Sequence, residues 1–519
     1  MHSLLPSRLA SAALLATLLA CGGGGGDAPP ATTPVIVPVD GPAWPGFGGN
    51  AQHSAIGAVQ AQPLTAVAWH APLDLVPPYQ ANGSLLIHYG SPVISRHNTV
   101  LMPVKTGAGS FRVDARIGQT GSLRWSLASD YRLPTPAPTW TPSFNIALTP
   151  GGRLYMPAAG GRLRVREDVD NDAIATTGTV AFYSGACDTC DTTVHINTPL
   201  TTDSQGNVFF GFSVNGANSL GLTGGGIARI AADGTGSYVL ASAASGDAAI
   251  VKPQVNSAPA LSADEQTLYV VVNNRVTAPT RASGRLLALN SSTLATVGNR
   301  PLLDPASGAP AWVSDNATSS PTVGPDGDVY IGVLEATGTL HNFRGWLLHF
   351  NAALTTVKTP AAFGWDITAS VVPRAMVPQY TGPSSYLLAI KYNNYGGAGG
   401  DGRNRMAVVD PGQSQADAYG TSVMVMREIL TILGPTADPA FPGGVKEWCV
   451  NTVAVDPLGS SLLVNSEDGK LYRWHLPSNL FTEQVVLTGG LAEAYTPTAI
   501  GADGRVYAVN NATLFSVGR

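Results

Sequence analysis

Charged residues are scarce in this chain, and those present are scattered rather than clustered. Lysine and arginine number 29 and aspartate and glutamate 34 among 519 residues, so 12% of the sequence is charged and the net charge is −5. Surfaces that bind nucleic acid need dense patches of lysine and arginine. The composition therefore argues against a nucleic-acid partner.

Several motifs with known chemistry are missing as well. There is no G-x-S-x-G nucleophile elbow, no H-E-x-x-H metal pair and no phosphate-binding P-loop, and the nine histidines are dispersed. Cysteine occurs only four times, and no two cysteines are adjacent. The sequence thus gives no support to the hydrolase, zinc-protease and nucleotide-binding classes that these motifs define.

Glycine and proline, in contrast, are abundant. The chain contains 59 glycines and 39 prolines, and 44% of its residues are apolar. This composition is typical of many short strands joined by tight turns, not of long amphipathic helices. The apolar fraction also argues against disorder.

The first twenty residues have the layout of a secretion signal. Arg8 precedes an apolar stretch from Leu9 to Ala20, which is too short to span a bilayer comfortably. Residues 18–21, Leu-Leu-Ala-Cys, resemble the lipobox of bacterial lipoproteins, in which the cysteine is acylated. The resemblance implies lipid attachment, such as palmitate, at Cys21. The alternative is an ordinary signal peptide cleaved near Ala20.

The residues after Cys21 are expected to form a tether. A run of glycines is followed by a segment rich in proline, alanine and threonine, which cannot bury enough apolar surface to fold. Because Gly22 rather than aspartate follows the cysteine, the lipoprotein sorting rule of Gram-negative bacteria implies the outer membrane, facing the periplasm or the cell surface. We expect a signal peptide in residues 1–20, a lipidated tether in residues 21–43 and one folded, monomeric domain in residues 44–519.

One short pattern recurs eight times in the rest of the chain. Each copy begins with a small residue and a proline, continues through an apolar strand, a Gly/Asp/Asn turn and a second strand that often carries tyrosine, and ends in a third strand with alternating apolar residues. In seven copies the proline is Pro92, Pro142, Pro199, Pro259, Pro321, Pro497 or, as a looser match, Pro373, and in the remaining copy Val453 takes its place.

Each copy is a β-meander that cannot bury both of its faces alone, so the copies are expected to stack radially. We therefore predict an all-β fold, an eight-bladed β-propeller of four-stranded antiparallel blades. The last copy ends after its third strand, whereas a spare strand occurs at residues 66–73, with Trp69 placed as Trp125 is in the first copy. The N-terminal strand is thus expected to close the last blade. The tether would then join the propeller at this seam and leave both faces free for partners.

The blade pattern resembles the pyrroloquinoline-quinone-type (PQQ-like) repeat of the quinoprotein dehydrogenase-like propellers, which include an outer-membrane assembly lipoprotein. Segments such as GDVYIGV and GRLLALN carry the resemblance, together with the opening WPGFGGNAQHS at residues 44–54. It covers about residues 44–519. It implies the scaffold rather than one activity.

The enzymatic branch of this family is matched poorly. Its alcohol dehydrogenases hold the quinone under a ring formed by two adjacent cysteines and bind a calcium ion with carboxylate and amide oxygens. Here two residues separate Cys187 from Cys190, and Asp191 stands where a haem-attachment motif needs histidine. No cofactor is therefore predicted, with PQQ and Ca²⁺ as the alternative.

The cysteines of the mature chain are expected to be structural. Cys187 and Cys190 lie in a secreted loop where oxidation is permitted, and the neighbouring Asp188 opposes a reactive thiolate, so a local disulfide is favoured. Cys449 is expected to be a buried small apolar residue. It would be a nucleophile only with a histidine close by.

An acidic run is a weak candidate for metal binding. Asp168, Asp170 and Asp172 space their oxygens like the first half of a calcium loop. The turn glycine and distal glutamate of an EF-hand are missing. A solvated acidic loop is therefore the favoured interpretation.

Residues just before the first strand of each blade are expected at the mouth of the central channel, where loops on a rigid scaffold commonly bind ligands. Aromatic and amide side chains dominate these positions, which suits a sugar or a peptide segment. The alternative is that these side chains fill the channel and cap strand ends. The candidates are His88, Tyr89, Trp140, His195, Asn197, Asn256, Asn316, Trp365, Asp366, Trp448, Asn451, Glu493 and Tyr495.

The insertion at residues 391–405 combines tyrosines and asparagines with flexible glycines. It is expected to form either a lid over the mouth or a surface loop. A carboxylate pair for sugar cleavage, Asp366 with Glu447 or Glu493, requires that the fold bring the two within about 5 to 10 Å.

These patterns favour an envelope-anchored propeller that acts as a binding or assembly module for a protein or carbohydrate partner at the channel mouth. The alternative is an enzyme, either of the quinoprotein dehydrogenase-like type or a carbohydrate-active hydrolase or lyase. Membrane contact is expected through the lipid anchor only.

Overall fold

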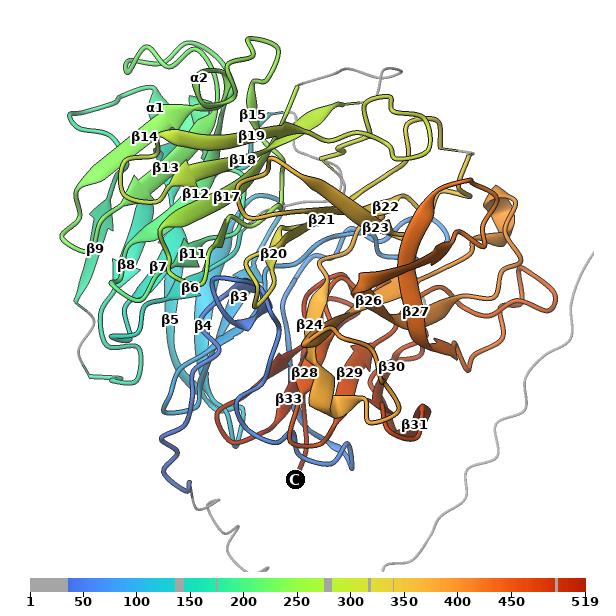
Figure 1. Ribbon diagram of the computed structural model, residues 1–519. Coiled ribbons are helices and arrows are strands. Elements are labelled where there is room, and N and C mark those ends of the chain that lie inside the picture. The colour runs from blue at the N-terminus through green and yellow to red at the C-terminus, as the bar shows by residue number, and fades with distance from the viewer. Residues whose placement is uncertain are drawn as a thin grey trace, which may run out of the picture. The chain divides into compact units, whose positions relative to one another are not determined.

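Each repeat of the sequence forms one four-stranded antiparallel sheet, because its short apolar strands are separated by turns tight enough to pair neighbours along the chain. The computed structural model describes residues 36–135, 144–173, 176–274, 282–315, 319–338, 340–490 and 493–519. Within the unit Pro38–Arg519, the sheets form the eight blades of a propeller (Figure 1). The predicted fold class is confirmed.

The first four blades run from the inner to the outer strand in chain order. Blade 1 contains β2 (Val93–Ile94), β3 (Thr99–Lys105), β4 (Phe111–Ile117) and β5 (Leu123–Ser129); blade 2 contains β6 (Ala147–Leu148), β7 (Leu154–Pro157), β8 (Leu163–Arg166) and β9 (Thr177–Val180); blade 3 contains β10 (Val194–Ile196), β11 (Thr201–Thr202), β12 (Val208–Val214), β13 (Gly226–Ile230) and β14 (Gly236–Leu240); blade 4 contains β15 (Lys252–Pro253), β16 (Ala260–Leu261), β17 (Thr267–Asn273), β18 (Gly284–Asn290) and β19 (Thr296–Pro301).

The last four blades follow the same plan. Blade 5 contains β20 (Thr322–Val323), β21 (Val329–Val333), β22 (Trp346–Phe350) and β23 (Val357–Ala361); blade 6 contains β24 (Ser370–Pro373), β25 (Tyr386–Tyr392), β26 (Arg405–Ala416) and β27 (Met424–Leu433); blade 7 contains β28 (Ala454–Asp456), β29 (Ser461–Asn465), β30 (Lys470–His475) and β31 (Leu480–Val486); blade 8 contains β32 (Ala499–Ile500), β33 (Val506–Asn510), β34 (Thr513–Val517) and β1 (Val67–Pro72).

In the residues that the structure describes, every helical element is at most five residues long. The short helices are α1 (Cys190–Thr193) and α2 (Ala241–Ser245), and the 3₁₀ turns are η1 (Phe47–Gly49), η2 (Ala159–Gly161), η3 (Arg374–Met376) and η4 (Gly396–Ala398). In the described part of the chain, none of these elements has the length and apolarity that crossing a membrane demands.

Two details of the repeat differ from the expected pattern. In blades 3 and 4 the inner strand is split, so β10 and β11 both pair with β12, and β15 and β16 both pair with β17. In blade 6, Pro373 is the last residue of the inner strand and not the residue before it. Val453, in contrast, directly precedes β28, as Pro92, Pro259 and Pro321 directly precede β2, β16 and β20.

Tyrosines on the second strands connect neighbouring blades. The hydroxyl of Tyr269 donates to the carbonyl of Ala352 at 2.9 Å, which joins blade 4 to blade 5. The hydroxyls of Tyr330 and Tyr386 lie 2.5 Å apart and join blade 5 to blade 6. Because each ring is also buried in the apolar layer between two sheets, the recurring tyrosine both fills the core and satisfies a polar group of the next blade.

The ring is closed by the N-terminal strand, as predicted. β1 pairs antiparallel with β34, and Val67 lies opposite Val517. Blade 8 therefore takes three strands from the C-terminus and its outer strand from the N-terminus. Closure of this kind removes two exposed sheet edges.

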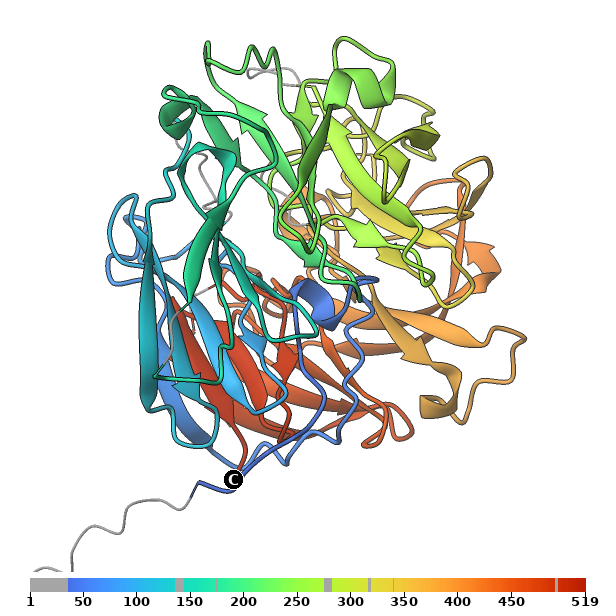
Figure 2. The ribbon, with the colours of Figure 1, turned by 90° about the vertical axis from the view of Figure 1, so that its left-hand side faces the viewer.

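A segment before β1, residues 44–57, crosses one end of the ring, and we call it the crossing segment. Figure 2 shows its 3₁₀ turn η1 in blue at the middle of the ring of blades. Its backbone hydrogen-bonds in turn to the inner strands of six blades, pairing Trp44 with Ile94, Pro45 with Leu148, Ala51 with Leu261, Gln52 with Val323, Ser54 with Val371, and Ala55 and Gly57 with Val455. Gly48 and Gly49 have positive φ angles of 61° and 84°, which permits the tight turn at its centre.

The crossing segment corrects one expectation about the faces of the propeller. Gly41 donates its N–H to the carbonyl of Arg96 in blade 1 and lies against Ala502 of blade 8, so the chain does reach the propeller at the seam. From there it runs across the ring end. One face is therefore covered by the protein's own backbone, and only the opposite mouth remains for the site described next.

Candidate functional site

A cavity of about 450 Å³ lies at the end of the ring opposite the crossing segment. The crossing segment bonds near the last residues of the inner strands, whereas the cavity is lined by loops that precede inner strands or join second to third strands. Antiparallel pairing places those two kinds of loop at the same end of a blade. Its principal side chains are Trp312, Phe343, Trp365, Asp366, Lys391, Tyr395, Glu447, Cys449 and Tyr495.

Aromatic rings form much of the cavity wall. The rings of Trp312 and Trp365 stack with centroids 5.9 Å apart and an interplanar angle of 29°. Both backbones are fixed, because Trp312 forms a bridge with Leu334 and the N–H of Trp365 donates to the carbonyl of Arg344. Two indoles held in this way offer a flat apolar platform to a ligand.

A charged pair faces the same cavity. Lys391 Nζ lies 3.9 Å from Asp366 Oδ2, a distance too long for a direct hydrogen bond, and both side chains are buried. His88 Nε2 is 3.8 Å from the same carboxylate oxygen. Burial lowers the pKa of His88 to about 4, with Asp366 opposing and Lys391 reinforcing the effect. His88 is therefore neutral at pH 7, and the pair consists of one cation and one anion.

A second polar group lies along the wall formed by residues 447–449. The Cys449 thiol donates to Glu467 Oε2 at 3.0 Å. Burial, reinforced by Glu467 and Glu447, raises the pKa of the Cys449 thiol well above its ordinary value. Burial together with Glu467 raises the pKa of Glu447 to about 7. Cys449 is therefore a neutral thiol, whereas Glu447 is poised to exchange a proton near neutral pH.

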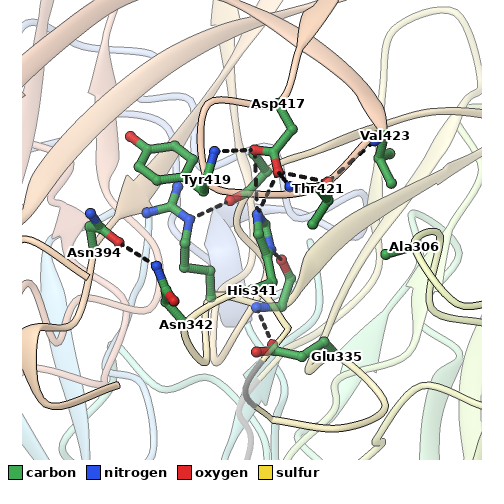
Figure 3. A network of polar contacts seen from close by, with 12 residues as sticks. Ala306, Glu335, His341, Asn342, Asn394, Asp417, Tyr419, Thr421 and Val423 are labelled. Atoms are coloured by element: carbon green, nitrogen blue, oxygen red, sulfur yellow. Dashed lines mark hydrogen bonds and ion pairs between the residues drawn. The ribbon is translucent and has the colours of Figure 1, made fainter. Parts of the chain in front are cut away.

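The segment that carries Phe343 into the cavity is fixed by a polar network (Figure 3). Glu335 accepts the backbone N–H groups of Phe343 and Gly345, each at 2.7 Å. His341 stacks on Trp346 with centroids 3.9 Å apart, and its Nε2 lies 3.4 Å from Asp417. The wall is therefore held by hydrogen bonds within the loop between β21 and β22, by stacking on Trp346 of β22, and by Asp417 in the loop between β26 and β27.

Arg344 links this network to the insertion at residues 391–405. Its guanidinium lies 3.5 Å from the ring centroid of Tyr419 and 4.5 Å from that of Tyr392, and it donates to the carbonyl of Asn393. Asn393 in turn exchanges two hydrogen bonds with the backbone of Trp448, each at 3.1 Å. Tyr395 of the same insertion lines the cavity. The insertion therefore lies at the mouth as a hydrogen-bonded wall.

Several predicted mouth residues lie away from the main cavity and hold blades together. Tyr89 donates to Asp74 at 2.8 Å, His195 bonds the carbonyl of Arg132, and Asn197 donates to the carbonyl of Pro253. The Asn256 N–H donates to the carbonyl of Asn197, and Asn451 bonds its neighbour Thr452. Trp140 and Asn316 lie outside the described residues.

Two further candidates differ in their surroundings. Trp448 is almost fully buried and packs against Tyr472 and Phe481 in the core of blade 7. Glu493 lines a smaller cavity of about 240 Å³, which Tyr495 also lines. Trp365, Asp366 and Tyr495 are thus the predicted residues that the fold brings together at one cavity.

The acidic run after β8 joins blades 1 and 2. Asp170 Oδ1 accepts from the hydroxyls of Ser95 and Thr99 at 2.6 and 2.5 Å, and Asp172 pairs with Arg124 at 2.7 Å. Asp168 lies in a turn with φ 47°. These contacts use the carboxylates as acceptors for the protein's own donors.

The disulfide candidates lie beside blade 2. Cys187 and Cys190 are bonded, with Cα atoms 5.4 Å apart. Asp191, next to the disulfide, pairs with Arg162 at 2.6 Å. This arrangement fixes the loop between β9 and β10.

The donor set does not fit a calcium-bound quinone. Within the described ranges, no group of three or more His, Cys, Asp or Glu side chains is placed to hold a metal ion. At the cavity, the position beside Asp366 where a cation would bind is already taken by Lys391. The disulfide lies in a loop between β9 and β10, whereas the cavity wall is built from residues 312–495.

Several cavity residues were not among the mouth candidates, namely Trp312, Phe343, Lys391, Tyr395 and Glu447. Lys391 and Tyr395 belong to the insertion whose composition marks it as unusual. Phe343 comes from a loop between second and third strands, and such loops reach the mouth without directly preceding an inner strand. Counting both loop types at one end of the ring could have found it.

Comparison with known proteins supports the propeller fold but assigns no family or activity to the chain. No protein-family model matches the chain, and no curated protein matches it in sequence. Among solved structures, propellers that include a methanol dehydrogenase share the fold, which confirms the expected resemblance at the level of the scaffold.

Three of these structures illustrate the likeness. A europium-containing methanol dehydrogenase superposes with a TM-score of 0.54 at 11% identity, over 90% of this chain and 89% of that one. The Dos1 propeller gives 0.50 at 11% identity, over 88% and 97%. BamB from Moraxella catarrhalis gives 0.44 at 12% identity, over 89% and 100%.

Proposed function

We propose that this protein is a binding module that takes a sugar unit of a carbohydrate partner into the mouth cavity. One observation carries the proposal, the pairing of an indole platform with a buried cation and anion that do not bond each other directly. Lys391 Nζ and Asp366 Oδ2 are 3.9 Å apart beside Trp365. The pair presents a donor and an acceptor side by side.

A sugar matches this arrangement in two ways. Each hydroxyl both donates and accepts, so neighbouring hydroxyls would take a hydrogen bond from Lys391 and give one to Asp366. The apolar face of the sugar ring would stack on Trp365, as aromatic side chains favour flat apolar contact. A cavity of about 450 Å³ suits one or two sugar units.

The setting of the binding module is the second part of the proposal. The signal-like residues 1–20 and the lipobox-like cysteine support export and attachment to the outer membrane through Cys21. The chain reaches the propeller at the face crossed by residues 44–57, and the cavity opens at the other end. A tethered propeller of this kind would keep its mouth cavity free for a partner.

Binding can be tested with a glycan array, followed by isothermal titration of the purified protein with the best-bound oligosaccharide. Trp365→Ala should weaken binding about tenfold or more, because the stacking platform is lost. Tyr238→Ala is the matched control, since Tyr238 is an aromatic residue exposed on β14, away from the cavity. Binding of no glycan, or equal affinity of the Trp365→Ala variant, would contradict the proposal. Capture of a protein instead would favour the assembly role.

A further inference from the structure

We propose that the mouth cavity cleaves a glycosidic bond in the carbohydrate it binds, with Glu447 as the general acid and Asp366 as the general base. This inference rests on the proposed sugar-binding function and deepens it. It is carried by two carboxylates that line one cavity in unlike surroundings. Glycosidases that act by inversion use such a pair across the scissile bond.

The two carboxylates come from different blade junctions. Asp366 belongs to the loop between β23 and β24, where its φ of 54° is held by neighbouring hydrogen bonds such as that from the Trp365 N–H. Glu447 precedes β28, beside a backbone that Asn393 fixes. Both carboxylates line the same cavity of about 450 Å³, and inverting enzymes hold their two carboxylates roughly 6.5 to 9.5 Å apart so that a water molecule fits between them and the sugar.

The surroundings of Asp366 favour a general base, whereas those of Glu447 favour a general acid. Asp366 lies beside the Lys391 ammonium, which stabilises a negative charge there. Glu447 is partly buried, and desolvation together with Glu467 raises its pKa to about 7, so a large fraction carries a proton at neutral pH. The titratable and charged groups that face Glu447 are Glu467, Lys391, Asp438, Lys446, Tyr395 and Cys449. Environments that separate two carboxylates in this way are typical of acid–base pairs.

The reaction balances without a further reagent. Glu447 gives its proton to the glycosidic oxygen as the bond from that oxygen to the anomeric carbon breaks. Water attacks the anomeric carbon, forms the new carbon–oxygen bond and gives one proton to Asp366. The products are an alcohol and a sugar with a free reducing end. Proton transfer from Asp366 to solvent and from solvent to Glu447 restores the starting state.

The inference is tested by incubating the purified protein with the oligosaccharides that bind it and with 4-nitrophenyl glycosides of the same sugars. New reducing ends and nitrophenol are measured. Glu447→Gln should lower the rate roughly 100-fold or more, while the sugar still binds. Glu167→Gln is the control with unchanged rate, because Glu167 pairs with Arg153 and lies in blade 2, outside the cavity.

A pH profile separates a general acid from a structural glutamate. Glu467 raises the pKa of Glu447, so Glu467→Gln should move the alkaline limb of the profile to lower pH. An unmoved limb, or full activity of Glu447→Gln, would overturn the assignment. Binding without any hydrolysis would overturn the inference and leave the binding function standing. Absence of both binding and hydrolysis would remove both.

Discussion

The indole N–H of Trp69 donates to the backbone carbonyl of Gly118 at 2.7 Å and thereby joins the last blade to the first. Trp125, at the same place in blade 1, donates to the carbonyl of Val169 in blade 2 at 3.0 Å. The closing strand thus repeats, across the seam, a contact that elsewhere links blades continuous in sequence. The seam is held by side chains as well as by the β1–β34 ladder.

Replacing Trp69 with alanine should lower the free energy of unfolding by about 3 to 5 kcal/mol, because a large buried ring is lost and the Gly118 carbonyl loses the shorter of its two hydrogen bonds. Urea unfolding followed by intrinsic fluorescence measures the change. Leu123→Ala on exposed β5 is the control and should change little. Equal loss in both variants would show that the seam contact adds nothing.

His53 in the crossing segment should make stability depend on pH. Its Nδ1 lies 2.7 Å from the carbonyl of Pro321, and burial lowers its pKa from 6.5 to about 4. The unfolded chain therefore takes up a proton at higher pH than the folded chain. Neutral His53 contributes about 3 kcal/mol above pH 6.5, and this contribution is lost as the pH falls from 6.5 through 4.

Urea unfolding at pH 7.5 and at pH 5 measures this loss. His53→Asn cannot be protonated, so its stability should fall less between the two pH values. His97→Asn replaces an exposed histidine and should keep the wild-type dependence. If the stability of His53→Asn fell between pH 7.5 and pH 5 as much as that of the wild type, the prediction would be contradicted.

The disulfide should be worth about 2 kcal/mol, since it closes a very short loop. A variant with both Cys187→Ser and Cys190→Ser should unfold at lower urea concentration by that amount. Reductant should destabilise the wild type to the level of the variant and leave the variant unchanged. If reductant lowered the stability of the double variant as well, its effect could not be attributed to the Cys187–Cys190 disulfide.

Cys449 should resist alkylation in the folded protein. Its thiol is buried, bonded to Glu467 and has a raised pKa, so little thiolate forms at pH 8. Mass spectrometry after iodoacetamide treatment should find Cys449 modified only when denaturant is added. Equal labelling with and without denaturant would disprove the burial argument.

Cys21→Ser should release the protein from the membrane fraction and abolish incorporation of an alkyne-labelled fatty acid. The lipid chains supply the anchoring free energy, about 0.8 kcal/mol for each buried methylene. Cys449→Ser keeps the lipobox-like sequence and should stay in the membrane fraction. Membrane retention of the Cys21→Ser protein would contradict lipid attachment at that residue.

The sequence predicted the blade count, the strand order and the closing strand because these follow from local alternation and from turn residues. Val453 could be aligned without a proline because its neighbours keep the alternation. Pro373 could not be aligned correctly, since the proline stands at the other end of its strand. The contacts of the crossing segment join backbone atoms far apart in sequence, and no side-chain pattern encodes them.

The candidate site was predicted less completely. Glu447 and Cys449 line the cavity, whereas Trp448 between them packs into the core. Successive side chains along an extended backbone point in opposite directions. The prediction chose Trp448 for its size, and so it missed the two neighbours that face the cavity. Asp366 and Tyr495 were found because both lie in the loop that leads into an inner strand, β24 or β32. Phe343 was missed because it follows a second strand.

The crossing segment also sets an order of events during synthesis, which proceeds from the N-terminus. Residues 44–57 emerge first, yet the backbone groups they bond extend to Val455, and the partner of β1 is β34 at the far end. Trp44 meets Ile94 early, but Ala55, Gly57 and β1 lack their hydrogen-bond partners until almost the whole chain has been made. A chain stopped before its last blade would leave β1 unpaired, which marks incomplete molecules for proteolysis or for holding by a chaperone.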